Sequence, residues 1–230
     1  MEYDGISRDS LFLLADNRFR NSRDFYEEHK QQIKDGVTVP MRQIAGIIGS
    51  ELSELDPFMV TNPVKMVSRI RRDTRYTKDK SLYREHAWAM FMRDKRQWEG
   101  YPCFWFEVTP QNYSLGVGIF GASSSLMQNF RKAIRERTDE FSDAVHGCEL
   151  TGALLHGSSY KRMPAGCPEG MEDYYGMKSF GYIVYSNELD DLADEKIIEI
   201  LKGYYSAFSP LYKFLLSVAD ETFQAYESAE

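Results

Sequence analysis

The chain has 230 residues, of which 43% are hydrophobic, and its net charge at neutral pH is −7. This length and composition are typical of a globular protein whose core needs no disulfide or metal ion to hold it together. The negative charge argues against general nucleic-acid binding, because proteins with that function are usually basic.

The sequence contains no segment typical of a signal peptide or a membrane span. The first apolar run, from Leu11 to Ala15, is short and is flanked by Asp9 and Asp16, whereas a spanning helix needs roughly 18 apolar residues. The three cysteines and four histidines form no zinc-binding pattern. We therefore expect a cytoplasmic protein without a metal site or membrane contact. The sequence leaves its cofactors and its oligomeric state open.

The N-terminal part of the chain, residues 1–60, is predicted to be helical. Apolar side chains recur there at helical spacing. Ser22 has the side chain of an N-cap, and Gly36 is expected to end the helix that Ser22 begins. The predicted helices cover residues 6–16, residues 22–34 and the stretch from Pro40 to Asp56.

Residues 61–186 are predicted to hold the sheet. The clearest β signal is a hairpin, because Leu115, Val117 and Ile119 alternate with smaller residues after a short turn. The predicted elements are strands at 64–71, 101–109, 113–120 and 179–185, helices at 81–93 and 123–138, an irregular loop at 147–176, and C-terminal helices at 188–203 and 208–226. We therefore predict a single α+β domain over residues 1–230, with a mixed or antiparallel sheet, a central hairpin and flanking helices.

A basic segment stands out in this acidic chain. Residues 69–84 hold seven lysines and arginines against two aspartates, a net charge of +5. Such a segment needs anionic partners, which are either carboxylates of the chain itself or an external ligand. In the first case its arginines and aspartates pair with one another and lock the predicted strand at 64–71 to the predicted helix at 81–93.

In the second case the segment binds an anion. Guanidinium groups form paired hydrogen bonds with carboxylate or phosphate, and the free N–H groups of a helix beginning at Ser81 would also favour an anion. Two aspartates would orient the cations or act as a catalytic acid or base. The candidate ligand-binding residues are Arg72, Arg75, Lys78, Lys80 and Arg84, and the candidate catalytic residues are Asp73 and Asp79.

The same segment carries a resemblance to a known family. From Arg72 to Arg84 the chain reads RDTRYTKDKSLYR. This resembles R-D-x-R-F-[ST]-K-D-K-x-P-Y-K, the signature of the family catalogued as domain of unknown function 2461, with Tyr76 in place of the Phe and Leu82 in place of the Pro. The resemblance implies membership of the family and brings no activity, cofactor or site residue with it.

Weaker matches to the same family flank the signature in the expected order. They lie at residues 21–30, at residues 126–134, which include Arg131, and at residues 160–166 followed by 178–180. Lys161 and Arg162 belong to the third match and to the loop predicted at 147–176. We add Arg131, Lys161 and Arg162 to the candidate ligand-binding residues, on the hypothesis that this loop folds over the basic segment.

A glycine pattern at residues 116–121, GVGIFG, matches the G-x-G-x-x-G of dinucleotide-binding sites. Such a site also requires a buried parallel strand and an acidic residue about 20 positions further on. Asp139 and Glu140 have this spacing, but the stretch from Asp139 to Gly147 is not an apolar strand. We favour the alternative, a strand that packs closely against a neighbour.

Three hypotheses for function follow. In the first, the protein binds or transforms a small molecule that carries phosphate or carboxylate, at the segment from Arg72 to Arg84. In the second, the segment holds a nucleic acid or an acidic protein without catalysis, nucleic acid being the less favoured partner because of the chain's charge. In the third, the motif is purely structural and the functional surface lies elsewhere.

Overall fold

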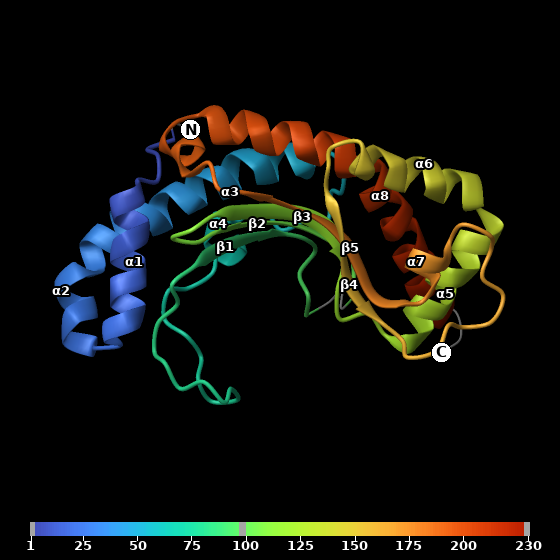
Figure 1. Cartoon of the computed structure of the whole chain (residues 1–230), viewed down its shortest axis with the longest axis horizontal. Helices are drawn as coiled ribbons and strands as arrows, with labels where there is room; N and C mark the ends of the chain where they lie inside the picture. Colours follow the sequence, from blue (N-terminus) through green and yellow to red (C-terminus); the bar gives the residue numbers. More distant parts are fainter. Residues whose placement is uncertain (1–2, 97–99, 228–230) are drawn as a thin grey trace. The chain divides into compact units, whose positions relative to one another are not determined.

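The computed structural model describes residues 3–96 and 100–227 of the chain. Its strands are β1 (Ala87–Phe91), β2 (Cys103–Val108), β3 (Tyr113–Ile119), β4 (Leu154–Ser159) and β5 (Met177–Ser186). They form one antiparallel sheet in the order β1-β2-β3-β5-β4, which is flanked by helices (Figure 1). The predicted α+β class and the central hairpin, now β2 and β3, are confirmed.

The helices are α1 (Arg8–Arg20), α2 (Arg23–Ile33), α3 (Val39–Leu52), α4 (Pro63–Met66), α5 (Ser124–Glu136), α6 (Thr138–Glu149), α7 (Glu172–Tyr175) and α8 (Lys196–Glu227). A π-helical turn, η1 (Lys34–Thr38), and a 3-10 turn, η2 (Leu189–Ala193), complete the set for the described residues. The Ser22 side chain accepts an N–H group at the start of α2, as predicted for an N-cap, and Ser123 does the same at the start of α5. No helix in the described ranges is long and apolar enough to cross a membrane.

The chain divides into two compact units that are each built from separate stretches of sequence. The first unit comprises Met1–Phe91, Trp105–Leu115 and Tyr185–Lys202, and the second comprises Met92–Phe104, Gly116–Val184 and Gly203–Glu230. The single domain expected over residues 1–230 stays a prediction. The signature segment, residues 72–84, belongs wholly to the first unit.

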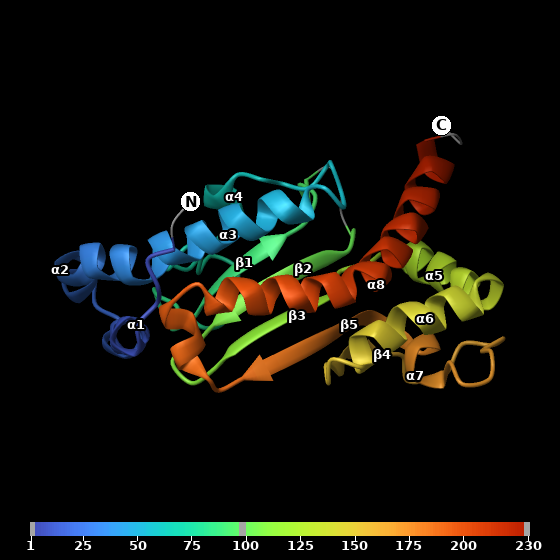
Figure 2. The same ribbon diagram turned by 90° about the horizontal axis from the view of Figure 1, so that it is seen from above.

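In the first unit, α3 packs along strand β1 (Figure 2). Its side chains Met41, Ile44 and Ile48 are fully or almost fully buried, and they recur at the spacing of one helix face. The paired helices α1 and α2 contact each other, and Leu14 of α1 is fully buried. This packing gives α1 a fixed position from which its polar side chains reach the signature segment.

In the second unit, aromatic rings from several elements form the core. Phe141 of α6 lies 5.6 Å from Phe130 of α5, 5.2 Å from Phe214 of α8 and 5.2 Å from Tyr174 of α7, measured between ring centroids. Phe180 of β5 lies 5.4 Å from Phe130. Tilted and edge-on rings at these distances stabilise a core beyond the burial of their area. This cluster fixes α5, which carries Arg131, against β5, which carries Lys178.

Two predicted elements around the signature segment are wrong. Residues 64–71 are not a strand, because the Asn62 side chain caps the short helix α4, which begins at Pro63. Residues 81–93 are not a helix, because strand β1 occupies their second half with a period-2 burial pattern. Since no helix begins at Ser81, the argument for an anion site at a helix N-terminus there is also wrong.

The long loop predicted at 147–176 is interrupted by β4 and α7. Strand β4 was not predicted from the sequence. All of its residues are exposed, so neither face carries the alternating apolar residues that mark a strand in a sequence. It lies at the edge of the sheet, and its pairing with β5 is irregular between Ser158 and Ser159. The backbone of Gly157 has a φ of +151° there, a conformation that favours glycine.

Three further boundaries differ from prediction. Gly36 does not end a helical stretch, because η1 carries the chain directly from α2 into α3. The helix α6 was not predicted. Separate helices were predicted at 188–203 and 208–226. The structure instead has the turn η2 followed by one continuous helix, α8, which contains Pro210. Proline removes one backbone hydrogen bond, and buried neighbours such as Phe208 and Leu211 keep the helix continuous.

The glycine pattern at residues 116–121 reflects close packing between β3 and β5. A methyl group on Gly118 would collide with the carbonyl oxygen of Phe180, and one on Gly181 would meet the carbonyl oxygen of Val117. These obstacles are backbone atoms, which cannot rotate away. The strand-packing interpretation accounts for Gly118, whereas Gly121 has a φ of +71° and nothing within 4 Å of an added methyl group.

We expect Gly118→Ala to lower the free energy of unfolding by roughly 1–3 kcal/mol, the usual cost of overpacking. Gly203→Ala is the matched control, because nothing lies within 4 Å of the added methyl group on α8. There the same change should stabilise the protein by about 1 kcal/mol through helix propensity. Chemical denaturation measures both values, and equal effects of the two substitutions would contradict this account of the glycine pattern.

Candidate functional site

The signature segment forms an excursion within the first unit: the chain runs outward, turns and returns alongside itself. The N–H of Arg72 donates to the carbonyl of Leu82 at 2.8 Å, and the N–H of Arg84 donates to the carbonyl of Ile70 at 2.9 Å. Residues 73–81 therefore form the outer loop of an irregular antiparallel pair. The basic side chains therefore lie on the outgoing and returning backbone segments and on the loop that joins them.

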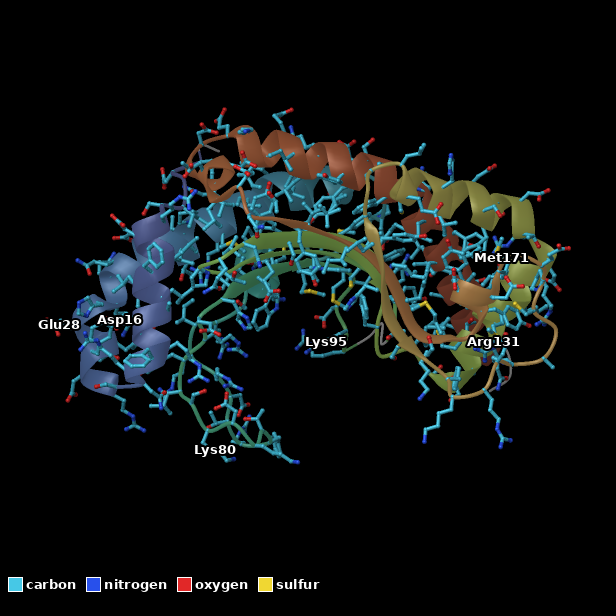
Figure 3. All side chains as sticks on the ribbon, viewed as in Figure 1. Asp16, Glu28, Lys80, Lys95, Arg131 and Met171 are labelled. Carbon is cyan, nitrogen blue, oxygen red and sulfur yellow. The ribbon has the colours of Figure 1, made fainter. Side chains whose placement is uncertain are left out.

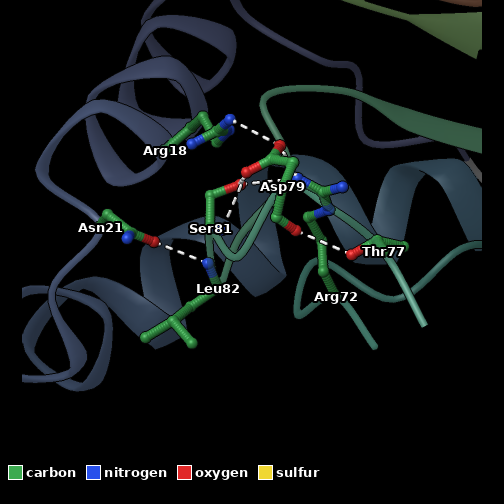
Figure 4. Close-up of polar contacts among 7 residues, drawn as sticks. All are labelled: Arg18, Asn21, Arg72, Thr77, Asp79, Ser81 and Leu82. Carbon is green, nitrogen blue, oxygen red and sulfur yellow. Dashed lines mark hydrogen bonds and ion pairs between the residues drawn. The ribbon is translucent and has the colours of Figure 1, made fainter. Parts of the chain in front are cut away.

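Helix α1 fastens this excursion at two points (Figure 4). Arg18 donates to the Asp79 carboxylate at 3.1 Å, and the Asn21 side chain accepts the N–H of Leu82 at 2.6 Å. Asn21 is the C-cap of α1 and has a left-handed backbone with a φ of 49°, a conformation that asparagine adopts more readily than most residues. The end of α1 therefore sets the position of the excursion.

The Asp79 carboxylate is the centre of the polar contacts in this region. One oxygen accepts the N–H of Ser81 at 2.9 Å and its hydroxyl at 2.7 Å, and the other accepts Arg18 and Arg72. The hydrogen bonds from Ser81, followed by the one from Arg72, hold the pKa of Asp79 far below its ordinary value. A carboxylate that stays ionised at neutral pH suits the orientation of cations better than the transfer of a proton.

The outer loop contains a second, separate pair. Asp73 accepts three hydrogen bonds from the Arg75 side chain, at 3.0, 3.3 and 2.7 Å, and one from its backbone N–H. These bonds lower the pKa of Asp73 to about 2. Lys80, near the outer end of the loop in Figure 3, donates to the carbonyl of Thr74 at 2.8 Å. These side chains and Lys78 are exposed.

A cavity of about 280 Å³ lies beside the fastened part of the excursion, within the first unit. Its lining combines three arginines with a histidine, a tyrosine and two carboxylates. The lining residues are Arg18, Arg72, Asp79, Tyr83, Arg84, Glu85 and His86. Three of the predicted site residues therefore line one cavity, whereas Asp73, Arg75, Lys78 and Lys80 do not.

Arg84 differs from the other two arginines of the cavity. It donates to the carbonyl oxygens of Arg69 and Arg71, at 2.9 and 3.2 Å, and lies 4.7 Å from the centre of the Trp88 ring. Among the residues that the structure describes, no carboxylate forms an ion pair with it. Partial burial, and then the positive charge of Arg72, lower the pKa of Arg84.

Arg18, Glu85 and His86 are cavity residues that the sequence reasoning did not single out. His86 lies 3.2 Å from the Glu107 carboxylate, which orients its ring. Glu85 and His86 directly follow the signature, and extending the signature by two residues would have found them. No local signal identifies Arg18, because its contact with Asp79 spans 61 positions of the chain.

The remaining predicted site residues belong to the second unit. Arg131 lies on α5 and is buried, whereas Lys161 and Arg162 are exposed in the segment that follows β4. The guanidinium carbon of Arg131 lies 5.4 Å from the centre of the Tyr160 ring, next in sequence to Lys161. The hypothesis that these cations share a ligand with the signature segment stays a prediction. Among the described residues, no group of three or more histidine, cysteine or acidic side chains could hold a metal ion.

We expect Asp79→Asn to lower the melting temperature at neutral pH, because it removes the charge that Arg18 and Arg72 contact. A carboxylate whose pKa is lowered by folding stabilises the protein above its ordinary pKa of about 3.9 and loses this effect as the pH falls. The difference from wild type should thus be constant between pH 8 and about pH 5 and shrink below about pH 4. Melting curves across this range measure it.

The control for this experiment is Glu28→Gln, which changes an exposed carboxylate on α2 (Figure 3) that forms no ion pair in the described chain. It should melt together with wild type at neutral pH. A difference between Asp79→Asn and wild type that stayed the same at pH 3 would contradict an electrostatic role for Asp79.

Comparison with known proteins agrees with the resemblance of the signature segment. A family model matches residues 9–214, which is most of the chain and includes every motif discussed above. No curated protein matches the chain. The match confirms the predicted membership, and the chain belongs to the family of conserved hypothetical proteins described as DUF2461.

Proposed function

We propose that the protein binds a small ligand with a phosphate or carboxylate group in the cavity beside the signature segment. The observation that carries this proposal is the position of Arg84. Its guanidinium group lines the cavity without a carboxylate partner in the described part of the chain, and the positive charge of Arg72 acts on it.

The charges around the cavity support an anionic ligand. Three arginines and two carboxylates, Asp79 and Glu85, line the cavity, a net charge of +1 from these five side chains, and the Glu107 carboxylate lies beside His86. Asp79 already contacts both Arg18 and Arg72, so its charge is shared. An anion beside Arg84 would relieve the repulsion between arginines and accept charge-assisted hydrogen bonds.

The size of the cavity favours a small molecule. At about 280 Å³ it is near the lower limit of ligand sites, roughly 300–1,000 Å³. Arg84 and Arg72 would hold the anionic group, Asp79 would keep Arg72 and Arg18 in place, and Tyr83 and His86 would contact the remainder of the ligand. A nucleic acid would instead use the exposed cations of the outer loop, such as Arg75 and Lys80.

The ion pairs of the signature segment also fit the purely structural hypothesis. Asp79 joins the excursion to α1, and the pair of Asp73 and Arg75 is local to the loop. These pairs explain Arg18, Arg72 and Arg75 without a ligand. They do not include Arg84, which donates to the carbonyls of Arg69 and Arg71 but has no carboxylate partner in the described residues, so substitution of Arg84 tests the two hypotheses.

We expect Arg84→Met to weaken the binding of inorganic phosphate or a small dicarboxylate about tenfold or more, the effect of losing a charge-assisted hydrogen bond. A thermal-shift screen at low ionic strength would select the anion, and calorimetric titration would then measure its affinity. Arg84→Met keeps an apolar contact with Trp88 but loses the hydrogen bonds to the carbonyls of Arg69 and Arg71, so its melting curve must show that it is folded before its affinity is compared with that of wild type.

The matched control is Lys78→Met, which removes the same charge from an exposed position outside the cavity. Equal loss of binding in the two variants, or no response of wild type to any anion, would contradict the proposal. Binding of oligonucleotides that falls steeply with salt, and that depends on Arg75 and Lys80, would favour the nucleic-acid hypothesis instead.

A further inference from the structure

The second unit contains a buried arginine without an anionic partner. Arg131, on α5, is 9% exposed, and its Nη1 atom is buried without a hydrogen-bond partner. No ion pair to Arg131 occurs within residues 3–96 and 100–227. Burial of an unpaired charge is unfavourable, so such groups are usually paired or bound to a ligand. Arg131 therefore requires an explanation that the chain's own carboxylates do not provide.

A second cation shares the aromatic ring beside Arg131. The guanidinium carbon of Arg131 lies 5.4 Å from the centre of the Tyr160 ring, and the Nζ atom of Lys178 lies 5.2 Å from the same centre. Attraction to a ring partly stabilises each cation but leaves both charges in place. Two positive groups thus lie against one tyrosine ring, and within the described residues no carboxylate forms an ion pair with either of them.

The backbone around Tyr160 is fixed in position. The N–H of Tyr160 donates to the carbonyl of Gly176 at 2.8 Å. Further along, the Tyr175 hydroxyl donates to the carbonyl of Ala165 at 3.1 Å and also bonds to Arg135, one turn after Arg131 on α5. The segment after β4 is therefore held against α5, and the arrangement of the two cations and the ring is preformed.

We propose that Arg131, Tyr160 and Lys178 form a second anion site, which takes the phosphate group of a small phosphorylated molecule. Two uncompensated cations match the charge of a phosphate monoester, about −1.5 to −2 at neutral pH. Tyr160 is partly exposed and Lys178 is exposed, so the site is open to solvent. Arg131 is buried, and its electrostatic interaction with an anion is stronger there than in water. All three residues of this site belong to the second unit.

The test uses inorganic phosphate and the full chain in an Arg84→Met background, which removes the site proposed for the first unit. The substitution Arg131→Met should reduce the affinity for phosphate about tenfold, and Lys178→Met should reduce it severalfold. Calorimetric titration measures both affinities. Sodium chloride at matched ionic strength controls for screening. Binding that survives in the Arg84→Met background and is lost with Arg131 separates this site from the first.

The stability of the variants without phosphate gives a second readout. Arg131→Met replaces an unpaired buried charge with a shorter apolar chain, and removal of the desolvation penalty should let it melt at or above the temperature of its parent. Lys132→Met, on the exposed side of α5, is the matched control and should keep full phosphate affinity. The proposal is overturned if Lys178→Met and Lys132→Met bind phosphate equally, or if Arg131→Met melts far below its parent in phosphate-free buffer.

Discussion

The contacts of one carboxylate, Asp79, position the candidate site of the first unit. This group joins Arg72 and Ser81 of the excursion to Arg18 of α1. Without it, Arg18 and Arg72 would lack their common anionic neighbour, and among the described residues only the hydrogen bond from the N–H of Leu82 to the Asn21 side chain would still join the excursion to the end of α1. Because the Asp79 charge is shared between two arginines, Arg84 is left uncompensated. The same carboxylate thus lines the cavity and pairs with two of its three arginines.

The parts of the fold that could be predicted from sequence have local causes. Ser22 and Ser123 are N-caps because their side chains bond to N–H groups a few residues away, and the hairpin of β2 and β3 follows from alternation around a short turn. The errors concern elements decided by tertiary packing. Strand β1 looked helical because Trp88, Ala89 and Met90 are consecutive apolar residues, and only its pairing in the sheet separates the two faces.

The candidate site was predictable in part for the same reason. The charge of the signature segment identified Arg72, Asp79 and Arg84, which line the cavity. It could not separate them from Arg75 and Lys80, because composition does not tell the fastened part of an excursion from its outer loop. Arg131 was selected by its place in a family motif, but its burial beside Tyr160 follows from the aromatic core of the second unit and has no sequence signal of its own.

The exposed edge strand β4 has a consequence for the behaviour of the protein in concentrated solution. An open edge offers unpaired N–H and C=O groups to which a strand of another molecule can add. Leu154 and Leu155 are both exposed on this strand, so its first half would be attractive to such a partner. The glycine conformation at Gly157 and the irregularity between Ser158 and Ser159 interrupt the regular ladder. The regular part of this edge is therefore confined to the residues of β4 before the irregularity.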